Sequence, residues 1–426
     1  MNRHRSASPA SSALPAFVSR FLAVTGIVFA LAACGGGGSG GSGSGTASGT
    51  AAPASSATPQ ESQQLSEAAV LGQKIFLDQS LSASGKMACA SCHDPANAHA
   101  QTNSLAVQSG GPGSDITGFR AVPSLRYLSF NPVFSFAKDG TPTGGFNRDG
   151  RAQSLAEQGQ RPFLAPHEMA NASKEDVIAR MKKASYAERF KALFGAAIFD
   201  NPADAFDRVT FALQQYQKED NDFHPFDSKY DQFLAGSVQL SAAELRGLAF
   251  FNDPAKGNCA ACHTSARSSD GKPPLLTDFT FDNLGVPRNF AIPATADPAY
   301  FDLGLCGPDR TDLAGRTELC GAFKVPTLRN VATRKVFFHN GVFSSLRDVV
   351  RFYVRRDTNP EEWYPRAADG TIDKFNDLPP AMRKNVNTTE GPYNRQPGMA
   401  PALTDDEIDD VVRFLGTLTD GYRAAP

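Results

Sequence analysis

Apolar residues recur at helical spacing in two segments of the chain, each placed behind a capping box. Ser241 and Glu244 precede Leu245 and Leu248 in the first segment, and Thr404 and Glu407 open the second. The apolar stripe of the second segment consists of Ile408, Val411, Val412, Leu415 and Leu418. These patterns predict amphipathic helices whose apolar face packs against protein or against a bound group.

A third helix is predicted in "HNGVFSSLRDVVRFY", residues 339–353, where Ser345 and Asp348 can cap the start. Positions i, i+3, i+4 and i+7 of this helix share one face. They are Leu346, Val349, Val350 and Tyr353. Tyr353 is therefore expected to point inward, either as a core tyrosine with a satisfied hydroxyl or as a ligand.

Two short motifs repeat along the chain and carry the candidate chemistry. "CASCH" covers residues 89–93 and "CAACH" covers residues 259–263. C-x-x-C-H is the attachment signal of c-type haem, in which both cysteines form thioethers and the adjacent histidine ligates the iron. A zinc half-site or a redox dithiol would need no adjacent histidine. The motifs thus predict two haem c groups, bound by Cys89, Cys92 and His93 and by Cys259, Cys262 and His263.

The segments upstream of the two motifs also resemble each other. "GQKIFLD" (residues 72–78) and "GLAFFND" (residues 247–253) share a glycine, an apolar residue followed by phenylalanine, and a final aspartate. Each half reads as helix, loop and haem motif, and no strand-type alternation dominates. The predicted fold is mostly α, with two cytochrome c-like haem domains, residues 66–235 and 236–426, and long irregular connections.

The N-terminus has the pattern of an export signal. Basic residues precede an eleven-residue apolar run, Phe21–Leu31, which is too short to span a bilayer. "LAAC" (residues 31–34) resembles a bacterial lipoprotein cleavage site, with Cys34 as the lipidated residue; the alternative is an ordinary signal peptide and a chance cysteine. Residues 35–65 are Gly/Ser-rich and read as a flexible tether. We expect a lipid-anchored protein on the periplasmic side of a bacterial membrane.

The remaining composition narrows the picture further. A formal net charge of −2 gives no reason to expect nucleic-acid binding. Of the seven cysteines, Cys306 and Cys320 are left as a pair, and in an oxidising compartment they are expected to form a disulfide. Such a bond would contribute on the order of 3 kcal/mol.

Three longer stretches resemble the bacterial dihaem cytochrome c peroxidase and MauG family, over roughly residues 66–420. They are "FNRDGRAQSLAEQGQRPFLAPHEMAN" (146–171), "FDNLGV" (281–286) and "FKVPTLRNVATRKVFFHNGVFSSLRDVVRFY" (323–353). The resemblance implies one haem that reacts with peroxide and a second that stores or relays an electron. It also implies that Glu168 is the catalytic acid–base and that Gln158 shares its pocket, although residue types alone would make Glu168 a surface carboxylate. His167 departs from the usual apolar residue and is a second proton donor to consider.

The resemblance also bears on the iron ligands. Classical members place a second histidine in the loop that corresponds to residues 103–125, and this loop contains none. His99 is too close to His93 to reach the opposite face of a haem and is expected to be a solvated loop residue. The first haem is therefore predicted to be five-coordinate or water-bound. At the second haem, Tyr353 stands where classical members have methionine, as in the MauG branch, and an anionic oxygen ligand favours ferric iron.

Two departures from the family concern the space between the haems. Arg148 replaces the usual tryptophan, and Trp363, the one tryptophan of the chain, lies in a different region. Ala121 stands where an asparagine often binds calcium, so a calcium ion would depend on backbone carbonyls and water.

Three functions follow as hypotheses. The first is a haem peroxidase that reduces hydrogen peroxide with electrons from a periplasmic donor, a cytochrome c or cupredoxin. The second is a MauG-like enzyme that oxidises a residue on a protein substrate. The third is a non-catalytic dihaem electron carrier, which would need both irons six-coordinate.

Overall fold

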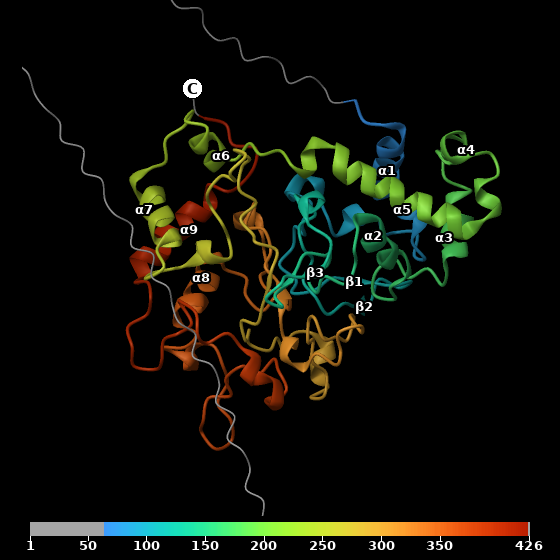
Figure 1. Ribbon diagram of the computed structural model, residues 1–426. Helices are drawn as coiled ribbons and strands as arrows, with labels where there is room; N and C mark the ends of the chain where they lie inside the picture. The colour runs from blue at the N-terminus through green and yellow to red at the C-terminus, as the bar shows by residue number, and fades with distance from the viewer. Residues whose placement is uncertain (1–63, 425–426) are drawn as a thin grey trace, which may run out of the picture. The chain divides into compact units, whose positions relative to one another are not determined.

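Most of the regular secondary structure of residues 64–424, the part of the chain that this computed structural model describes, is helical (Figure 1). The α-helices are α1 (Glu67–Leu77), α2 (Leu155–Leu164), α3 (Lys174–Met181), α4 (Ala187–Phe194), α5 (Pro202–Glu219), α6 (Lys229–Leu234), α7 (Ala242–Asn252), α8 (Leu346–Arg355) and α9 (Asp405–Gly416). The predicted mostly α fold is confirmed. The predicted signal peptide, Cys34 and the tether lie outside the described residues.

Strands are short in the described part of the chain. Each sheet there is an antiparallel pair of two-residue strands. The pairs are β1 (Ser109–Gly110) with β2 (Ile116–Thr117), β3 (Ser135–Phe136) with β4 (Pro142–Thr143), and β5 (Phe281–Asp282) with β6 (Phe323–Lys324). The rest of the connecting chain is irregular, as predicted.

The caps predicted from the sequence form as expected. The hydroxyls of Ser241 and Thr404 each accept a hydrogen bond from the backbone N–H of the third helical residue, and both capping boxes are complete. Ser345 caps α8 in the same way through the N–H of Asp348. These bonds satisfy backbone donors that the first turn of a helix cannot pair internally.

Two helix crossings repeat the same contact in the two halves of the chain. α1 packs against α5, and α7 packs against α9 (Figure 1). Gly72 of α1 lies against the carbonyl of Ala212, and Gly247 of α7 lies against the carbonyl of Asp410. A Cβ atom at either glycine would collide with that backbone. The glycines of the two repeated upstream segments therefore serve one purpose, close helix packing.

Each crossing belongs to its own apolar core. One core takes residues from Leu71 to Phe223 and includes Phe163, Phe190 and Phe206, all almost fully buried. The other takes residues from Tyr230 to Leu418 and includes Phe251 and Phe414. The division of the chain at residues 235 and 236 stays a prediction.

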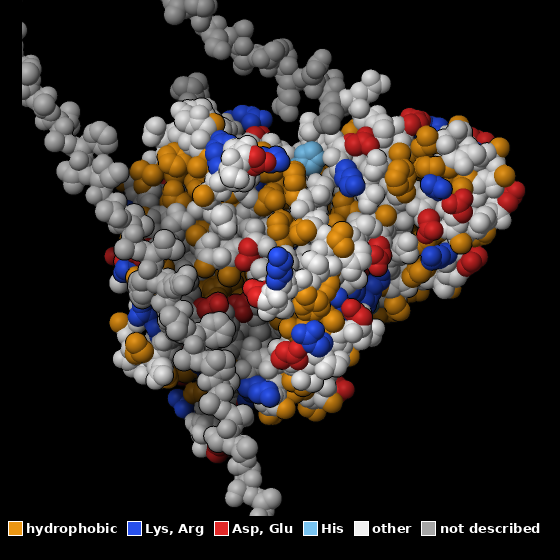
Figure 2. Space-filling model, viewed as in Figure 1, with side chains coloured by type: hydrophobic (Ala, Val, Ile, Leu, Met, Phe, Trp, Pro, Cys, Tyr) orange, Lys and Arg blue, Asp and Glu red, His pale blue; other side chains and the backbone are white. Residues whose placement is uncertain are grey.

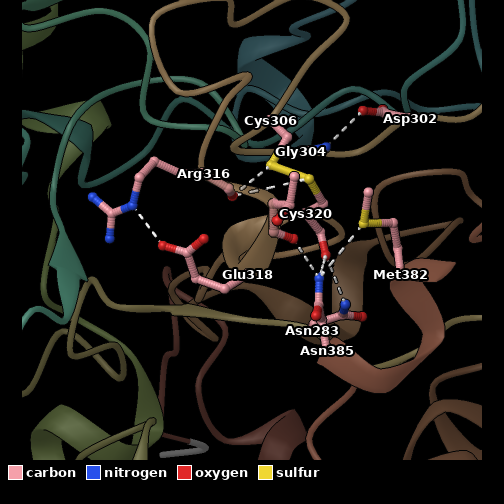
Figure 3. The surroundings of a disulfide bond; sticks show 10 residues. Asn283, Asp302, Gly304, Cys306, Arg316, Glu318, Cys320, Met382 and Asn385 are labelled. Atoms are coloured by element: carbon pink, nitrogen blue, oxygen red, sulfur yellow. Dashed lines mark hydrogen bonds and ion pairs between the residues drawn. A yellow bond between two sulfur atoms is a disulfide. The ribbon is translucent and has the colours of Figure 1, made fainter. Parts of the chain in front are cut away.

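Cys306 and Cys320 are joined by a disulfide in the segment before β6 (Figure 3). Their Cα atoms are 5.0 Å apart. The side-chain amides of Asn283 and Asn385 both donate to the carbonyl of Cys320, at 3.1 and 3.2 Å. These two hydrogen bonds tie the disulfide-closed loop to Asn283, which follows β5, and to Asn385 of the 3-10 helix Pro380–Asn385.

Charged side chains of both signs are interspersed on the face drawn in Figure 2, and no broad positive patch gathers there. Among the described residues, no helix is long and apolar enough to cross a membrane.

Candidate functional site

Both C-x-x-C-H motifs open onto a single cavity within the described chain. Each motif starts as a 3-10 turn, Cys89–Ser91 in the first half and Cys259–Ala261 in the second. In each turn the backbone N–H of the histidine donates a hydrogen bond to the backbone carbonyl of the first cysteine at 2.9 Å. This local bonding brings the two cysteines and the histidine of each motif to the cavity wall.

The two motif histidines are held in the same way. Nδ1 of His93 lies 3.2 Å from the carbonyl oxygen of His99, and Nδ1 of His263 lies 2.8 Å from that of Leu276. With the proton on Nδ1, Nε2 keeps its lone pair for a metal. Burial lowers the pKa of both rings, that of His93 to about 4, so both are neutral. Each histidine is therefore ready to ligate iron.

The four motif cysteines are free thiols that line the cavity. Burial raises the pKa of Cys89, Cys259 and Cys262 to about 12 and that of Cys92 to about 11. A redox dithiol uses a thiolate, which needs a lowered pKa, so these pairs do not suit dithiol chemistry. Residues 64–424 also hold no cluster of three or more His, Cys, Asp or Glu side chains suited to a metal ion.

The rest of the cavity wall fits a haem. Aliphatic side chains line both halves, among them Leu125 and Leu213 in the first and Val350 and Leu415 in the second. Cationic side chains also line it, among them Arg148, Lys324 and Arg334. A haem has an apolar macrocycle and two acidic propionates, so it matches a wall of aliphatic and cationic groups.

Glu168 and Gln158 share the wall of the first half with the Cys89–His93 motif. Gln158 comes from α2, and the chain then turns so that the N–H of Glu168 donates to the carbonyl of Ala165 at 2.9 Å. Oε2 of Glu168 is buried and has no hydrogen-bond partner among the described residues. Oε1 lies 3.8 Å from Nε2 of His167. The structure thus leaves one carboxylate oxygen of Glu168 free.

The charge around Glu168 favours a proton-transfer role. Burial raises the pKa of Glu168, and the guanidinium groups of Arg161 and Arg151 partly oppose that rise. Burial, with Arg161 and Arg151, lowers the pKa of His167, whose ring packs against Phe119 at 4.7 Å between centroids. A carboxyl with a raised pKa is a better acid–base near neutral pH than an exposed one.

The loop of residues 103–125 covers Glu168. The N–H of Gly111 donates to the carbonyl of Glu168 at 2.9 Å, and Gly110 lies too close to His167 and Glu168 to carry a side chain. Between residues 108 and 119 the loop reaches the cavity with Gln108, Ser109, Gly118 and Phe119. None of these is a usual iron ligand.

The expectation that His99 is solvated is wrong. Its side chain is fully buried, and its ring lies 3.9 Å from that of Phe223. The carbonyl of His99 lies at the ring of His93, so the residue supports the motif histidine through its backbone. Sequence spacing could not reveal this, because the burial comes from the distant residue Phe223.

Tyr353 lines the second half of the cavity from α8, together with Leu346, Val349 and Val350, the face that the sequence predicts. Its hydroxyl has no hydrogen-bond partner among residues 64–424, and burial raises its pKa. By contrast, the buried hydroxyl of Tyr230 donates to the carbonyl of Ser265. The free phenol oxygen fits a ligand better than a core tyrosine.

Sequence reasoning missed Tyr393, which lines the same half of the cavity. Its ring lies 6.0 Å from that of Tyr353. It follows a Gly-Pro pair in an irregular segment, so no periodic pattern marks it. Trp363 packs against Phe343 and Phe352 on the side of α8, at 5.7 and 5.6 Å, and does not line the cavity.

Comparison with known proteins gives matches along most of the chain. Residues 66–239 match the family model described as di-haem cytochrome c peroxidase. The methylamine utilization protein MauG of Paracoccus denitrificans is 35% identical over 367 residues, which cover 83% of this chain and 88% of that protein. A cytochrome c551 peroxidase of Nitrosomonas europaea is 29% identical over 73% of this chain and 79% of its own. The crystal structure of the diheme peroxidase BthA from Burkholderia thailandensis superposes with a TM-score of 0.77 at 40% identity, covering 84% of this chain and 87% of that one.

Proposed function

The chain belongs to the family of di-haem cytochrome c peroxidases and MauG proteins, and we propose that it reduces hydrogen peroxide with two covalently bound haem c groups. It is an oxidoreductase of the haem peroxidase type. One observation carries the proposal: Glu168 presents a free, buried carboxylate oxygen in the cavity that the Cys89–His93 motif also lines. An electron carrier has no use for such a group.

Named residues would hold the cofactors. Cys89, Cys92, Cys259 and Cys262 would supply the thioether bonds, and Nε2 of His93 and of His263 would ligate iron. When bound, the haems supply the iron chemistry that takes hydrogen peroxide, two electrons and two protons to two molecules of water.

Glu168 would move the proton in that reaction. Its carboxylate would accept a proton from one oxygen of hydrogen peroxide and return it to the other oxygen, which departs as water. Burial raises the pKa of Glu168, and this brings the carboxyl closer to the pH at which both proton acceptance and proton donation are efficient. Gln158, on the same wall, is placed to orient peroxide by hydrogen bonding.

Tyr353 is proposed as a residue that would hold the iron of the second haem. Ligation needs the phenolate, and a metal ion lowers the pKa of a coordinated group by withdrawing charge. Burial alone keeps this phenol protonated, so its ionisation would depend on the iron. The free hydroxyl supports the MauG-like alternative, in which a residue of a partner protein is oxidised.

The candidate functions differ in the source of their electrons. A small periplasmic donor, a cytochrome c or a cupredoxin, would serve a peroxidase, whereas a protein substrate would serve a MauG-like enzyme. The proposed location is the periplasmic side of a bacterial membrane, with lipid attached at Cys34. The proposed division puts the peroxide-reacting haem in residues 66–235 and the electron-transfer haem in residues 236–426.

A calcium ion between the haems is a further part of the cofactor proposal. The carbonyl of Ala121, a candidate ligand, already accepts two hydrogen bonds from Arg148. Activity and absorption spectra before and after treatment with a chelator would test whether a calcium ion contributes.

Steady-state assays with reduced cytochrome c separate the three functions. Peroxide-dependent oxidation of the cytochrome at many turnovers supports the peroxidase. Reaction of the ferric protein with peroxide, without turnover of the cytochrome or of a cupredoxin, supports the MauG-like alternative. Absence of any high-spin ferric signal, with no peroxide reaction, would leave only the electron carrier.

A further inference from the structure

Three cations face the cavity without an acidic partner. No carboxylate of the described chain lies within ion-pair distance of Arg148, Lys324 or Arg334, whose hydrogen bonds go to backbone carbonyls. Nearby Arg120 behaves differently, since it pairs with Asp149 and Asp302, both at 2.6 Å. The three residues are half-buried, and a charge withdrawn from water without a counter-charge is costly, so the unpaired set needs an explanation.

Arg148 lies where the two haem sites meet. Nε and Nη2 of its guanidinium donate to the carbonyl of Ala121 at 3.1 and 3.0 Å, and its own carbonyl accepts from the N–H of Lys324 at 2.8 Å. Ala121 is two residues from Pro123, whose carbonyl faces the ring of His93. Lys324 is two residues from Pro326, whose carbonyl faces the ring of His263. One residue thus joins the chain segments that support both motif histidines.

The other two cations flank this junction. Nη2 of Arg334 donates to the carbonyl of Val122 at 2.9 Å, and Nζ of Lys324 donates to that of Gly145 at 2.6 Å. Burial lowers the pKa of Lys324 to about 7, that of Arg148 to about 9 and that of Arg334 to about 10. The protein alone therefore disfavours these charges, and a bound anion would restore them.

We propose that Arg148, with Lys324 and Arg334, forms a cationic bridge that pairs with the propionates of both haems and raises both reduction potentials. The inference rests on the proposed haem content. Each haem brings two propionates, the kind of anion that a guanidinium binds in paired hydrogen bonds. A positive charge close to iron favours the reduced, less positive state.

Spectroelectrochemical titration of the holoprotein tests the bridge. Arg148→Gln keeps an amide that can donate to Ala121 but removes the charge. We expect the midpoint potentials of both haems to shift to more negative values. Arg366→Gln is the matched control, because Arg366 is exposed and its guanidinium also donates to a backbone carbonyl, that of Gly370. A shift at one haem only, or at neither, would overturn the proposal.

Further measurements separate the remaining outcomes. Should Arg148→Gln fail to fold, Lys324→Met is expected to shift both potentials in the same direction, and an unchanged pair of potentials there would equally overturn the bridge. Treatment with a chelator should leave both potentials unchanged; a shift that calcium reverses would assign the charge to a metal instead. Haem staining of the denatured wild-type chain tests independently whether haem is covalently bound. A chain that does not stain would contradict the proposed haem content rather than the bridge alone.

Discussion

The rings of Tyr353 and Tyr393 lie on the same wall of the cavity, with centroids 6.0 Å apart and planes inclined by 35°. Tyr393 is buried and Tyr353 is half-buried, and burial raises the pKa of both phenols. Tyr353 comes from α8 and Tyr393 from an irregular segment. Two tyrosines on this wall could therefore ligate the iron, whereas the sequence indicates Tyr353 alone. Substitution of each tyrosine distinguishes them.

Tyr353→Phe is predicted to leave both haems attached and to change the spin state of the second haem, because the variant loses the oxygen that would ligate iron. Electron paramagnetic resonance and absorption spectra of the ferric protein measure this change. Tyr393→Phe is the matched control and should keep the wild-type spectrum. If Tyr393→Phe changes the spectrum and Tyr353→Phe does not, the ligand is Tyr393.

Glu168→Gln is predicted to slow the reaction with peroxide by about 10²-fold or more, as expected for a lost acid–base group. The amide keeps the size of the side chain but cannot accept the proton. Stopped-flow absorbance gives the rate constant. Glu188→Gln, at an exposed carboxylate of α4, should react at the wild-type rate. A normal rate in Glu168→Gln would remove its assigned role.

The pH dependence of that reaction should report the environment of Glu168. Its pKa is raised mainly by burial, above the usual value of about 4.3 for glutamate. Proton acceptance needs the carboxylate, so the rate should fall as the pH drops through this raised pKa. An exposed glutamate would lose its activity only at lower pH. In Glu168→Gln this acid limb should disappear; its persistence would point to another group.

Gly72→Ala and Gly247→Ala should each destabilise the protein by about 1–3 kcal/mol, because the added methyl group collides with a backbone carbonyl across the helix crossing. Denaturant unfolding of the holoprotein measures the loss. Gly416→Ala is the control, since nothing lies within 4 Å of a Cβ atom at that end of α9. Equal stability of all three variants would contradict the close-packing role of the repeated glycines.

Local signals in the sequence predicted local structure well. The capping boxes at Ser241 and Thr404, and the inward face of α8 that carries Tyr353, are confirmed because each depends on residues within a few turns. α5 was not recognised, although it makes with α1 the crossing that α9 makes with α7. Its partnership with Gly72 depends on residues far apart in the chain.

Features that depend on tertiary contacts cannot be predicted from local sequence patterns. The burial of His99 is set by Phe223, and the cavity position of Tyr393 is set by an irregular segment without periodicity. The sequence leaves the role of Arg148 open, because it shows the residue type but not that the guanidinium donates hydrogen bonds to the carbonyl of Ala121. The positions of these residues depend on contacts between distant parts of the chain, which local sequence patterns do not reveal.

The central claim is that the first haem site is open and supplied with an acid–base group in the resting protein. Stopped-flow mixing of hydrogen peroxide with the fully ferric protein, followed at the Soret band, tests it most directly. We predict an immediate spectral change, because the cavity-lining residues of the loop 103–125 include no usual iron ligand and Glu168 is free. A change only after one-electron reduction would contradict the account, since it would mean that a ligand blocks the first iron at rest.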